Sequence, residues 1–229
     1  PSIPESKRRT VLYAPTWAGE DEANNYTSME FMGSRIIDAI LAQENVRVVY
    51  KPHPRIADAD DQRIRKNHAH VLRAIKQANA KDSNAGHQVR ESGDILAIFP
   101  RVDLLISDVS SIALDFLYLR TEAPIILTDR RNDIAQLRID SPLSAATPVL
   151  TKDNIKDAAK IIGEVLDADS FVQDRKVLRE FYFDNVQAGE SAPRFYQAMR
   201  DAITAHSADV ARAKSLAESG TGPRFEHRA

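Results

Sequence analysis

The 229-residue chain contains no cysteine. This absence excludes disulfide bonds, thiol nucleophiles and zinc sites built from thiolates. No apolar run reaches the roughly 18 residues that a membrane-spanning helix needs, and no signal peptide is apparent. The glycine-rich fingerprints of dinucleotide-binding and P-loop proteins are also missing, so any phosphate group must be bound by another arrangement.

The chain carries little net charge. Its formal charge is −2, so no global field recruits nucleic acid, and we expect no nucleic-acid partner. A hydrophobic share of 43% is enough for one large domain with appendages. The sequence begins at Pro1 rather than at methionine, and we expect it to be a fragment of a longer protein.

Short apolar runs alternate with helical patterns along the chain. This alternation predicts an α/β fold, with a Rossmann-like parallel sheet and helices on both faces. We expect residues 1–9 to be a linker, 10–205 a domain and 206–229 a flexible tail. Strands are predicted at 10–14, 46–50, 87–90, 103–107, 124–128 and 148–150; helices are predicted at 29–41, 58–81, 94–98, 110–119, 154–166, 171–182 and 193–205.

Polar clusters follow four of the predicted strands directly. They are Pro15-Thr16-Trp17, Lys51-Pro-His-Pro54, Ser107-Asp-Val-Ser-Ser111 and Thr128-Asp129. Ligands of such sheets bind beyond the carboxyl ends of the strands. The spacing therefore predicts one site at that edge of the sheet.

Ser110 and Ser111 open the helix after the third long strand. The partial positive charge and free N–H groups of a helix N-terminus bind phosphate, and serine hydroxyls add donors. Simple helix capping explains the same residues equally well. Asp108 and Asp115 flank the serines and are candidates for hydrogen bonding to a ribose or to helix donors, which we favour over metal binding.

His53 lies between two prolines at a strand end. A histidine there can act as general base, general acid or hydrogen-bond donor to phosphate, although a structural turn histidine is the alternative. His68 and His70 lack metal-binding helical spacing, so no metal site is predicted, and we expect the histidines other than His53 to be mostly solvated. Trp17 is a candidate for stacking on a base or for anchoring a loop.

Several of these segments together resemble the CDP-glycerol glycerophosphotransferase family of teichoic-acid synthesis. The similar segments occur in the family's order between about residues 10 and 200. They are Tyr13-Ala-Pro-Thr-Trp17, Lys51-Pro-His-Pro54, the stretch 103–116 (Asp-Leu-Leu-Ile-Ser-Asp-Val-Ser-Ser-Ile-Ala-Leu-Asp-Phe), Pro124-Ile-Ile-Leu, and Asp184 with Gly189-Glu-Ser-Ala-Pro-Arg194.

The resemblance implies the C-terminal half of a GT-B fold. This half binds a CDP-activated donor such as CDP-glycerol, while an N-terminal domain, missing here, helps present a lipid-linked acceptor. The implied reaction moves glycerol phosphate, or a related polyol phosphate, to that acceptor and releases CMP without a metal or cofactor. The implied location is the inner face of the bacterial cell membrane, as a peripheral cytoplasmic protein.

The resemblance also implies roles for individual residues. His53 matches the family's functional histidine, and Ser110 and Ser111 match its donor-phosphate serines. The other matching donor-site positions are Thr16, Asp108, Asp115, Ser191 and Arg194.

The chain departs from the family pattern at three places. Ala18-Gly19 follows Trp17 where the family usually has an arginine, Val109 replaces an aromatic residue, and Lys51-Pro52 replaces an arginine before the His-Pro pair. Lysine does not reproduce the bidentate phosphate contact of arginine. The sequence therefore leaves two alternatives, a GT-B glycosyltransferase domain that uses a nucleotide-sugar and a non-catalytic nucleotide-binding module.

Overall fold

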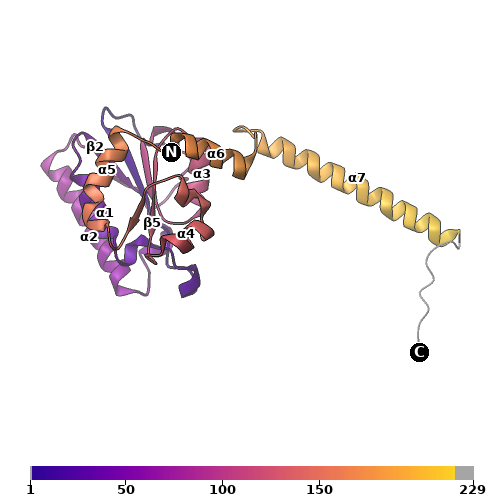
Figure 1. Ribbon diagram of the computed structural model, residues 1–229, viewed down its shortest axis with the longest axis horizontal. Coiled ribbons are helices and arrows are strands. Elements are labelled where there is room, and N and C mark those ends of the chain that lie inside the picture. The colour runs from indigo at the N-terminus through magenta and orange to yellow at the C-terminus, as the bar shows by residue number, and fades with distance from the viewer. Residues whose placement is uncertain (1, 220–229) are drawn as a thin grey trace. The chain divides into compact units, whose positions relative to one another are not determined.

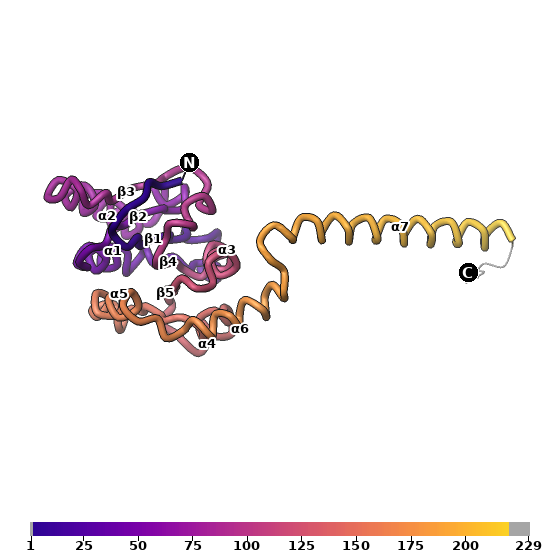
Figure 2. Tube along the Cα trace, turned by 90° about the horizontal axis from the view of Figure 1, so that it is seen from above, coloured from indigo at the N-terminus to yellow at the C-terminus, as the bar shows by residue number. Residues whose placement is uncertain are grey.

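The computed structural model describes residues 2–219. Within these residues, six strands form one parallel sheet in the order β3-β2-β1-β4-β5-β6. The trace in Figure 2 shows strands β3, β2, β1, β4 and β5 following one another in that order. The strands are β1 (Arg9–Ala14), β2 (Val46–Tyr50), β3 (Gln88–Val89), β4 (Leu104–Ser107), β5 (Ile125–Asp129) and β6 (Val149–Thr151).

Helices cover both faces of this sheet (Figure 1). On one face, α1, α2 and α5 pack against side chains such as Val11, Val48 and Ile106. On the other face, α3 and α6 pack against Leu12, Leu105 and neighbouring side chains. The helices are α1 (Gly33–Leu41), α2 (Gln62–Lys81), α3 (Ser111–Leu119), α4 (Ile134–Asp140), α5 (Ala158–Asp167), α6 (Val172–Phe183) and α7 (Ser191–Glu218).

The long strands are buried on both faces, which explains their sequence pattern. All residues of β2, β4 and β5 are buried. A parallel strand between two helical layers therefore reads as a continuous apolar run instead of an alternating one. The predicted α/β fold, with a Rossmann-like parallel sheet and helices on both faces, is confirmed.

Three local predictions differ from the structure. Residues 129–147, for which no helix was predicted, contain helix α4, which is capped by the Asp133 side chain on the Gln136 N–H. Residues 94–98 form a turn instead of a helix. Helix α1 begins at Gly33 because residues 28–30 form a separate 3-10 turn before it.

The predicted terminal segments are also more ordered than expected. Ile3 lies in the predicted linker but is buried in the core on the α3 face, where its apolar side chain anchors the N-terminal segment. Residues 206–218 continue α7, while residues 220–229 of the predicted tail lie outside the described residues. The chain divides into two compact units, Pro1–Asp184 and Asn185–Ala229, and the predicted limits of a donor-binding domain at 10 and 205 stay a prediction.

None of the helices in residues 2–219 combines the length and apolar character that crossing a membrane requires.

Candidate functional site

The strand order reverses between β1 and β4. From β1 the chain first builds β2 and β3 on one side, and then returns to build β4, β5 and β6 on the other. Connections on the two sides diverge at such a point and leave a crevice beyond the strand ends, where open α/β sheets bind ligands. The loops that follow β1 and β4 border this crevice, and they carry Thr16 and Asp108.

Asp108 joins the loops around the crevice from inside the protein. Its carboxylate accepts hydrogen bonds from the Thr16 N–H (2.8 Å) and from the Thr128 hydroxyl (2.6 Å), and also from Ser28. These partners follow β1 and end β5, so one side chain links three strand ends. The residue is fully buried, so its side chain positions these loops, and the donor contact that the resemblance implied stays a prediction.

The burial of Asp108 has an electrostatic consequence. Loss of solvation raises the pKa of the carboxyl from 3.8 to about 6, although the hydrogen bonds from Thr128, Ser28 and Thr16 oppose the shift. The same charge contributes, after burial itself, to raising the pKa of the Tyr13 hydroxyl. A carboxylate at this point is thus costly to ionise, and its hydrogen bonds offset part of that cost.

Helix α3 begins beside Asp108 with an open N-terminus. Ser110 is the N-cap residue, but its side chain makes no capping hydrogen bond within the described residues and lies 3.4 Å from the Ser107 hydroxyl. Ser111 is exposed on the first turn. Because the Ser110 side chain does not cap the helix, the capping explanation of this serine fails, and that side chain accepts no N–H of the first turn.

His53 is fixed by two hydrogen bonds at the end of β2. Its backbone N–H donates to the Pro15 carbonyl (3.1 Å), and its Nδ1 accepts from the Arg55 N–H (3.2 Å), which caps the 3-10 turn Pro54–Ile56. An accepting Nδ1 assigns the proton of the neutral ring to Nε2. Burial, helped by Arg55 and Lys51, lowers the pKa of His53 below 6.5, so the ring is neutral near pH 7.

Trp17 connects the His53 turn to the loop after β1. Its ring stacks on the His53 ring with centroids 5.9 Å apart, and the Arg55 guanidinium lies 4.0 Å from the Trp17 centroid. Arg55 also pairs with Glu20 (3.0 Å). A cavity of about 670 Å³ opens beside these groups, and its wall includes Trp17, Glu20, Arg55 and Asp60. Both partners of the tryptophan are side chains of this chain, so Trp17 anchors the loop.

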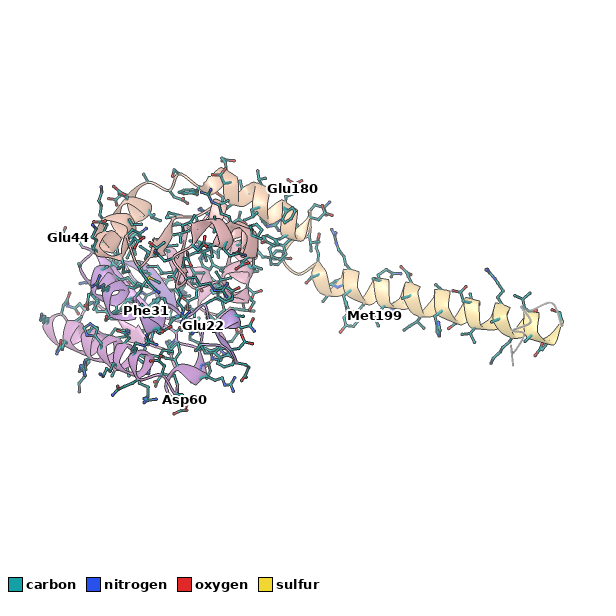
Figure 3. All side chains as sticks on the ribbon, turned by 60° about the horizontal axis from the view of Figure 1, so that its bottom comes forward. Glu22, Phe31, Glu44, Asp60, Glu180 and Met199 are labelled. Atoms are coloured by element: carbon teal, nitrogen blue, oxygen red, sulfur yellow. The ribbon has the colours of Figure 1, made fainter. Side chains whose placement is uncertain are left out.

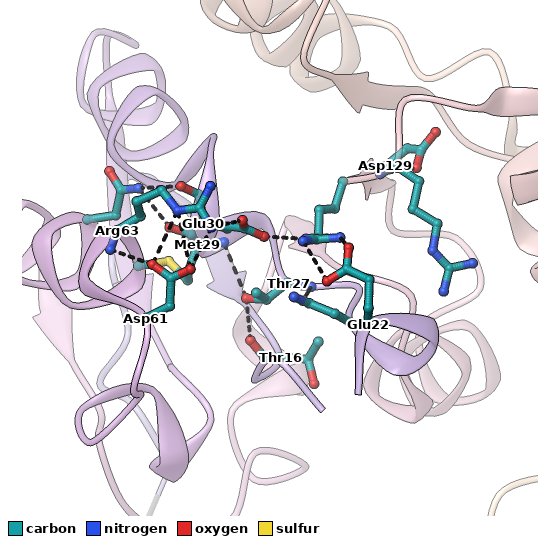
Figure 4. A network of polar contacts seen from close by, with 12 residues as sticks. Thr16, Glu22, Thr27, Met29, Glu30, Asp61, Arg63 and Asp129 are labelled. Carbon is teal, nitrogen blue, oxygen red and sulfur yellow. Dashed lines mark hydrogen bonds and ion pairs between the residues drawn. The ribbon is translucent and has the colours of Figure 1, made fainter. Parts of the chain in front are cut away.

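An ion-pair network surrounds Glu30 at the same edge of the sheet (Figure 4). Glu30 is 4% exposed and pairs with Arg130, which follows β5, and with Arg63 of α2 at 2.5 Å. Arg130 also pairs with Glu22 at 2.6 Å. The network connects the loop after β1, the start of α2 and the end of β5, so it supports the crevice from its outer side.

Sequence reasoning missed this network. The sequence pattern Thr27-Ser-Met-Glu30 is that of a capping box, but the Thr27 side chain alone caps the turn, and the Glu30 carboxylate pairs with the two arginines. Its partners lie 33 and 100 residues away in sequence, so no local pattern identifies them. Arg130 did carry one usable signal, its position directly after a buried strand.

Two histidines also differ from expectation. His68 is buried, and its Nδ1 lies 2.9 Å from the Tyr50 hydroxyl. His87 accepts a hydrogen bond from the Val48 N–H at Nδ1. Both are structural. His53 follows the carboxyl end of β2, and its choice as the candidate histidine stays a prediction.

The remaining candidates lie on α3 and α7, outside the loops that border the crevice. Asp115 is exposed on α3, one turn beyond Ser111. Ser191 and Arg194 belong to the second unit, at the start of α7, where Arg194 pairs with Glu190 (2.9 Å) and contacts Asn185. The described residues contain no cluster of three or more His, Asp or Glu side chains that could hold a metal ion.

The fold and crevice define the class of this protein as an α/β domain of the type found in GT-B transferases. Over residues 2–199 the sequence matches the family of CDP-glycerol:poly(glycerophosphate) glycerophosphotransferases, and the chain belongs to this family. The family resemblance noted from the sequence is thereby confirmed. No curated protein matches the chain.

Solved glycosyltransferases share the fold at low sequence identity. A UDP-forming α,α-trehalose-phosphate synthase from Burkholderia xenovorans matches with a TM-score of 0.54 and 10% identity, over 84% of this chain and 44% of its own. The α,α-trehalose 6-phosphate synthase from Burkholderia multivorans matches with a TM-score of 0.53 and 12% identity, over 97% of this chain and 45% of its own. Spinosyn forosaminyltransferase SpnP matches with a TM-score of 0.52 and 12% identity, over 85% of this chain and 44% of its own. The present chain thus spans less than half the length of these structures.

The pH dependence of stability tests the role of Asp108. Its folded-state pKa of about 6 lies above its unfolded value, so the stability it contributes is full below about pH 4 and is lost as pH rises through 6. We expect the difference in melting temperature between wild type and Asp108→Asn to shrink from pH 4 to pH 7. A difference that stays constant over this range would contradict a buried, raised-pKa carboxyl.

Proposed function

We propose that this chain is the donor-binding part of a transferase that moves glycerol phosphate, or a related polyol phosphate, from a CDP-activated donor to a hydroxyl acceptor. In this reaction the acceptor oxygen attacks the β-phosphorus of the donor, and CMP leaves with the α-phosphate. The family match over residues 2–199 carries the proposal. The placement of His53, Ser110 and the start of α3 at one sheet edge supports it.

The donor pyrophosphate binds at the start of α3. The uncapped N–H groups of the first turn and the hydroxyls of Ser110 and Ser111 supply donors, and the helix dipole supplies partial positive charge. Asp108 keeps its charge away from the phosphates because it is buried and engaged by three donors. It also accepts a hydrogen bond from the Thr16 N–H and so holds Thr16 at the rim of the crevice.

His53 donates a hydrogen bond from Nε2 to the reacting phosphate. Its Nδ1 is already used by the Arg55 N–H, so the neutral ring presents Nε2–H and has no free lone pair for a proton. This geometry favours stabilisation of the developing phosphate charge over removal of the acceptor proton. One such preorganised donor contributes about 3 kcal/mol, roughly a hundredfold in rate.

Arg55 compensates for one arginine that the family pattern places elsewhere. The chain has Gly19 two residues after Trp17, with a φ of 75° and a would-be Cβ only 2.7 Å from the Asn24 carbonyl, so no larger side chain fits there. The Arg55 guanidinium instead reaches the Trp17 ring from the turn after β2. In this proposal it serves the donor phosphates that the other arginine serves in relatives.

The whole enzyme requires more than these residues. We propose that an N-terminal GT-B domain completes it, that the acceptor is a lipid-linked wall or teichoic-acid polymer at the inner face of the membrane, and that no metal or cofactor takes part. Ser191 and Arg194 are proposed to contact the nucleotide. Asp115, one turn after Ser111 on α3, is proposed to contact the donor.

Replacement of His53 tests the catalytic assignment. In the full-length protein, His53→Asn retains an acceptor for the Arg55 N–H but removes the Nε2 donor. We expect CMP release from CDP-glycerol to fall about a hundredfold with an unchanged melting temperature. His70→Ala, which removes an exposed histidine paired with Asp38, is the matched control and should keep full activity. Normal turnover in His53→Asn would show that the assignment is wrong.

Donor binding tests the phosphate site in the 229-residue chain. We expect Ser111→Ala, and to a similar extent Ser110→Ala, to weaken CDP affinity about tenfold by calorimetry, because each removes a hydrogen bond to a charged group. The exposed Ser83→Ala in the turn before β3 is the control. UDP and GDP measured alongside CDP separate this family's donor from those of nucleotide-sugar enzymes. Unchanged CDP affinity in both serine variants would reduce them to helix-end residues.

The pH profile separates the two roles of His53. The pKa of His53 lies below 6.5, so a general base would lose activity as pH falls through that lowered pKa. A donor keeps Nε2–H in both protonation states, and we therefore expect no acid loss from His53. Because Asp108 titrates near 6, the profile of kcat/KM is compared with that of Asp108→Asn. An acid loss that persists in Asp108→Asn would assign His53 as the base.

A further inference from the structure

Helix α7 carries an apolar face that no other described residue of the second unit covers. It spans Ser191–Glu218, and none of its described residues is buried. Met199, labelled in Figure 3, is one of its exposed apolar side chains. The others are Phe195, Tyr196, Ile203, Val210 and Leu216. A surface helix of this length normally pairs its apolar face with another element.

The spacing of these residues indicates what kind of element that is. Steps of four and three alternate without interruption from 192 to 217, which is the heptad repeat of a coiled coil. A straight helix drifts from such a seam by about 20° per heptad, so two helices that keep this seam in contact along its length wrap around each other. The seam residues are Ala192, Tyr196, Met199, Ile203, His206, Val210, Ala213 and Ala217.

We propose that α7 forms a parallel, in-register, two-stranded coiled coil with α7 of a second copy of this chain. The β-branched Ile203 and Val210 occupy a positions, as two-stranded parallel coils favour, and the polar His206 is the single seam residue that fixes register. The alanines at 213 and 217 allow close approach of the two backbones near the end of the helix.

Charges beside the seam support this partner and this direction. In a parallel dimer, a g position contacts the following e position of the other helix. Asp209 stands at g and Lys214 at e, so each dimer gains two attractive pairs from these residues. Within one helix the two lie five residues apart and do not face each other.

The same charges argue against a membrane surface as the partner. Helices that lie on anionic bilayers carry mainly Lys and Arg beside the apolar face. Helix α7 carries three acidic residues, Asp201, Asp209 and Glu218, beside four basic residues. Asp209 directly borders the seam. The flanks are therefore mixed in sign, as between two protein helices.

Sedimentation of the 229-residue chain measures the association. We expect a concentration-dependent monomer–dimer equilibrium, and a dimer dissociation constant at least tenfold higher in Ile203→Asp and in Val210→Asp. Ala208→Asp, at the outward f position, is the matched control and should dimerise like wild type. Melting of the first unit checks that each variant remains folded. A monomer at all concentrations, or a dimer that both seam variants leave intact, overturns the proposal.

The absence of cysteine makes the direction testable by crosslinking. Ala213→Cys lies in the seam and meets its own copy only in a parallel, in-register dimer, so mild oxidation should give a disulfide-linked dimer. Ala208→Cys on the outer face should stay largely uncrosslinked. A dimer in which Ala213→Cys crosslinks no better than Ala208→Cys overturns the parallel arrangement.

Charge exchange tests the Asp209–Lys214 pairing. Asp209→Lys alone should weaken the dimer several-fold, and Asp209→Lys combined with Lys214→Asp should restore it. Failure of the double exchange to restore association would show that these side chains do not meet between copies.

Discussion

The buried carboxylate of Asp108 is the interaction on which the rest of the site depends. It lies at the point where the strand order reverses, and it accepts hydrogen bonds from the loop after β1 and from the end of β5. These segments are far apart in sequence and are joined here through one side chain without solvent. A site made of four separate loops needs such a connection, because each loop alone has little to fix it.

The arrangement also separates the charges of the site. Negative charge is kept inside, on Asp108 and Glu30, where hydrogen bonds and arginines neutralise it. The cavity beside Trp17 also carries the acidic Glu20 and Asp60. Toward the crevice, the start of α3, the Nε2–H of His53 and the Arg55 guanidinium present neutral or positive groups. Such an environment suits a pyrophosphate that gains charge on the leaving group during transfer. Figure 4 shows the ion pairs of Glu30 with Arg63 and Arg130, which connect the loops at the same edge.

Much of the fold followed from the sequence, because buried parallel strands produce continuous apolar runs and because turns after them are marked by proline and serine. The candidates His53 and Ser110 followed from the same logic. The role of Asp108 did not, since the sequence places the residue at the edge but does not give the direction of its side chain. The Arg130–Glu30 pair and helix α4 were missed for related reasons: one depends on contacts a hundred residues apart, and the other on a cap in a segment without clear apolar periodicity.

The central claim is that a CDP-linked donor binds with its phosphates at the start of α3 beside His53. Amide chemical shifts of the 229-residue chain, followed by NMR during titration with CDP, test it most directly. The account predicts saturable changes that are largest in residues 109–113, with further changes at 53–55 and 16–17. Changes centred elsewhere, for example on α2 or β3, or no saturable change at millimolar CDP, would contradict it.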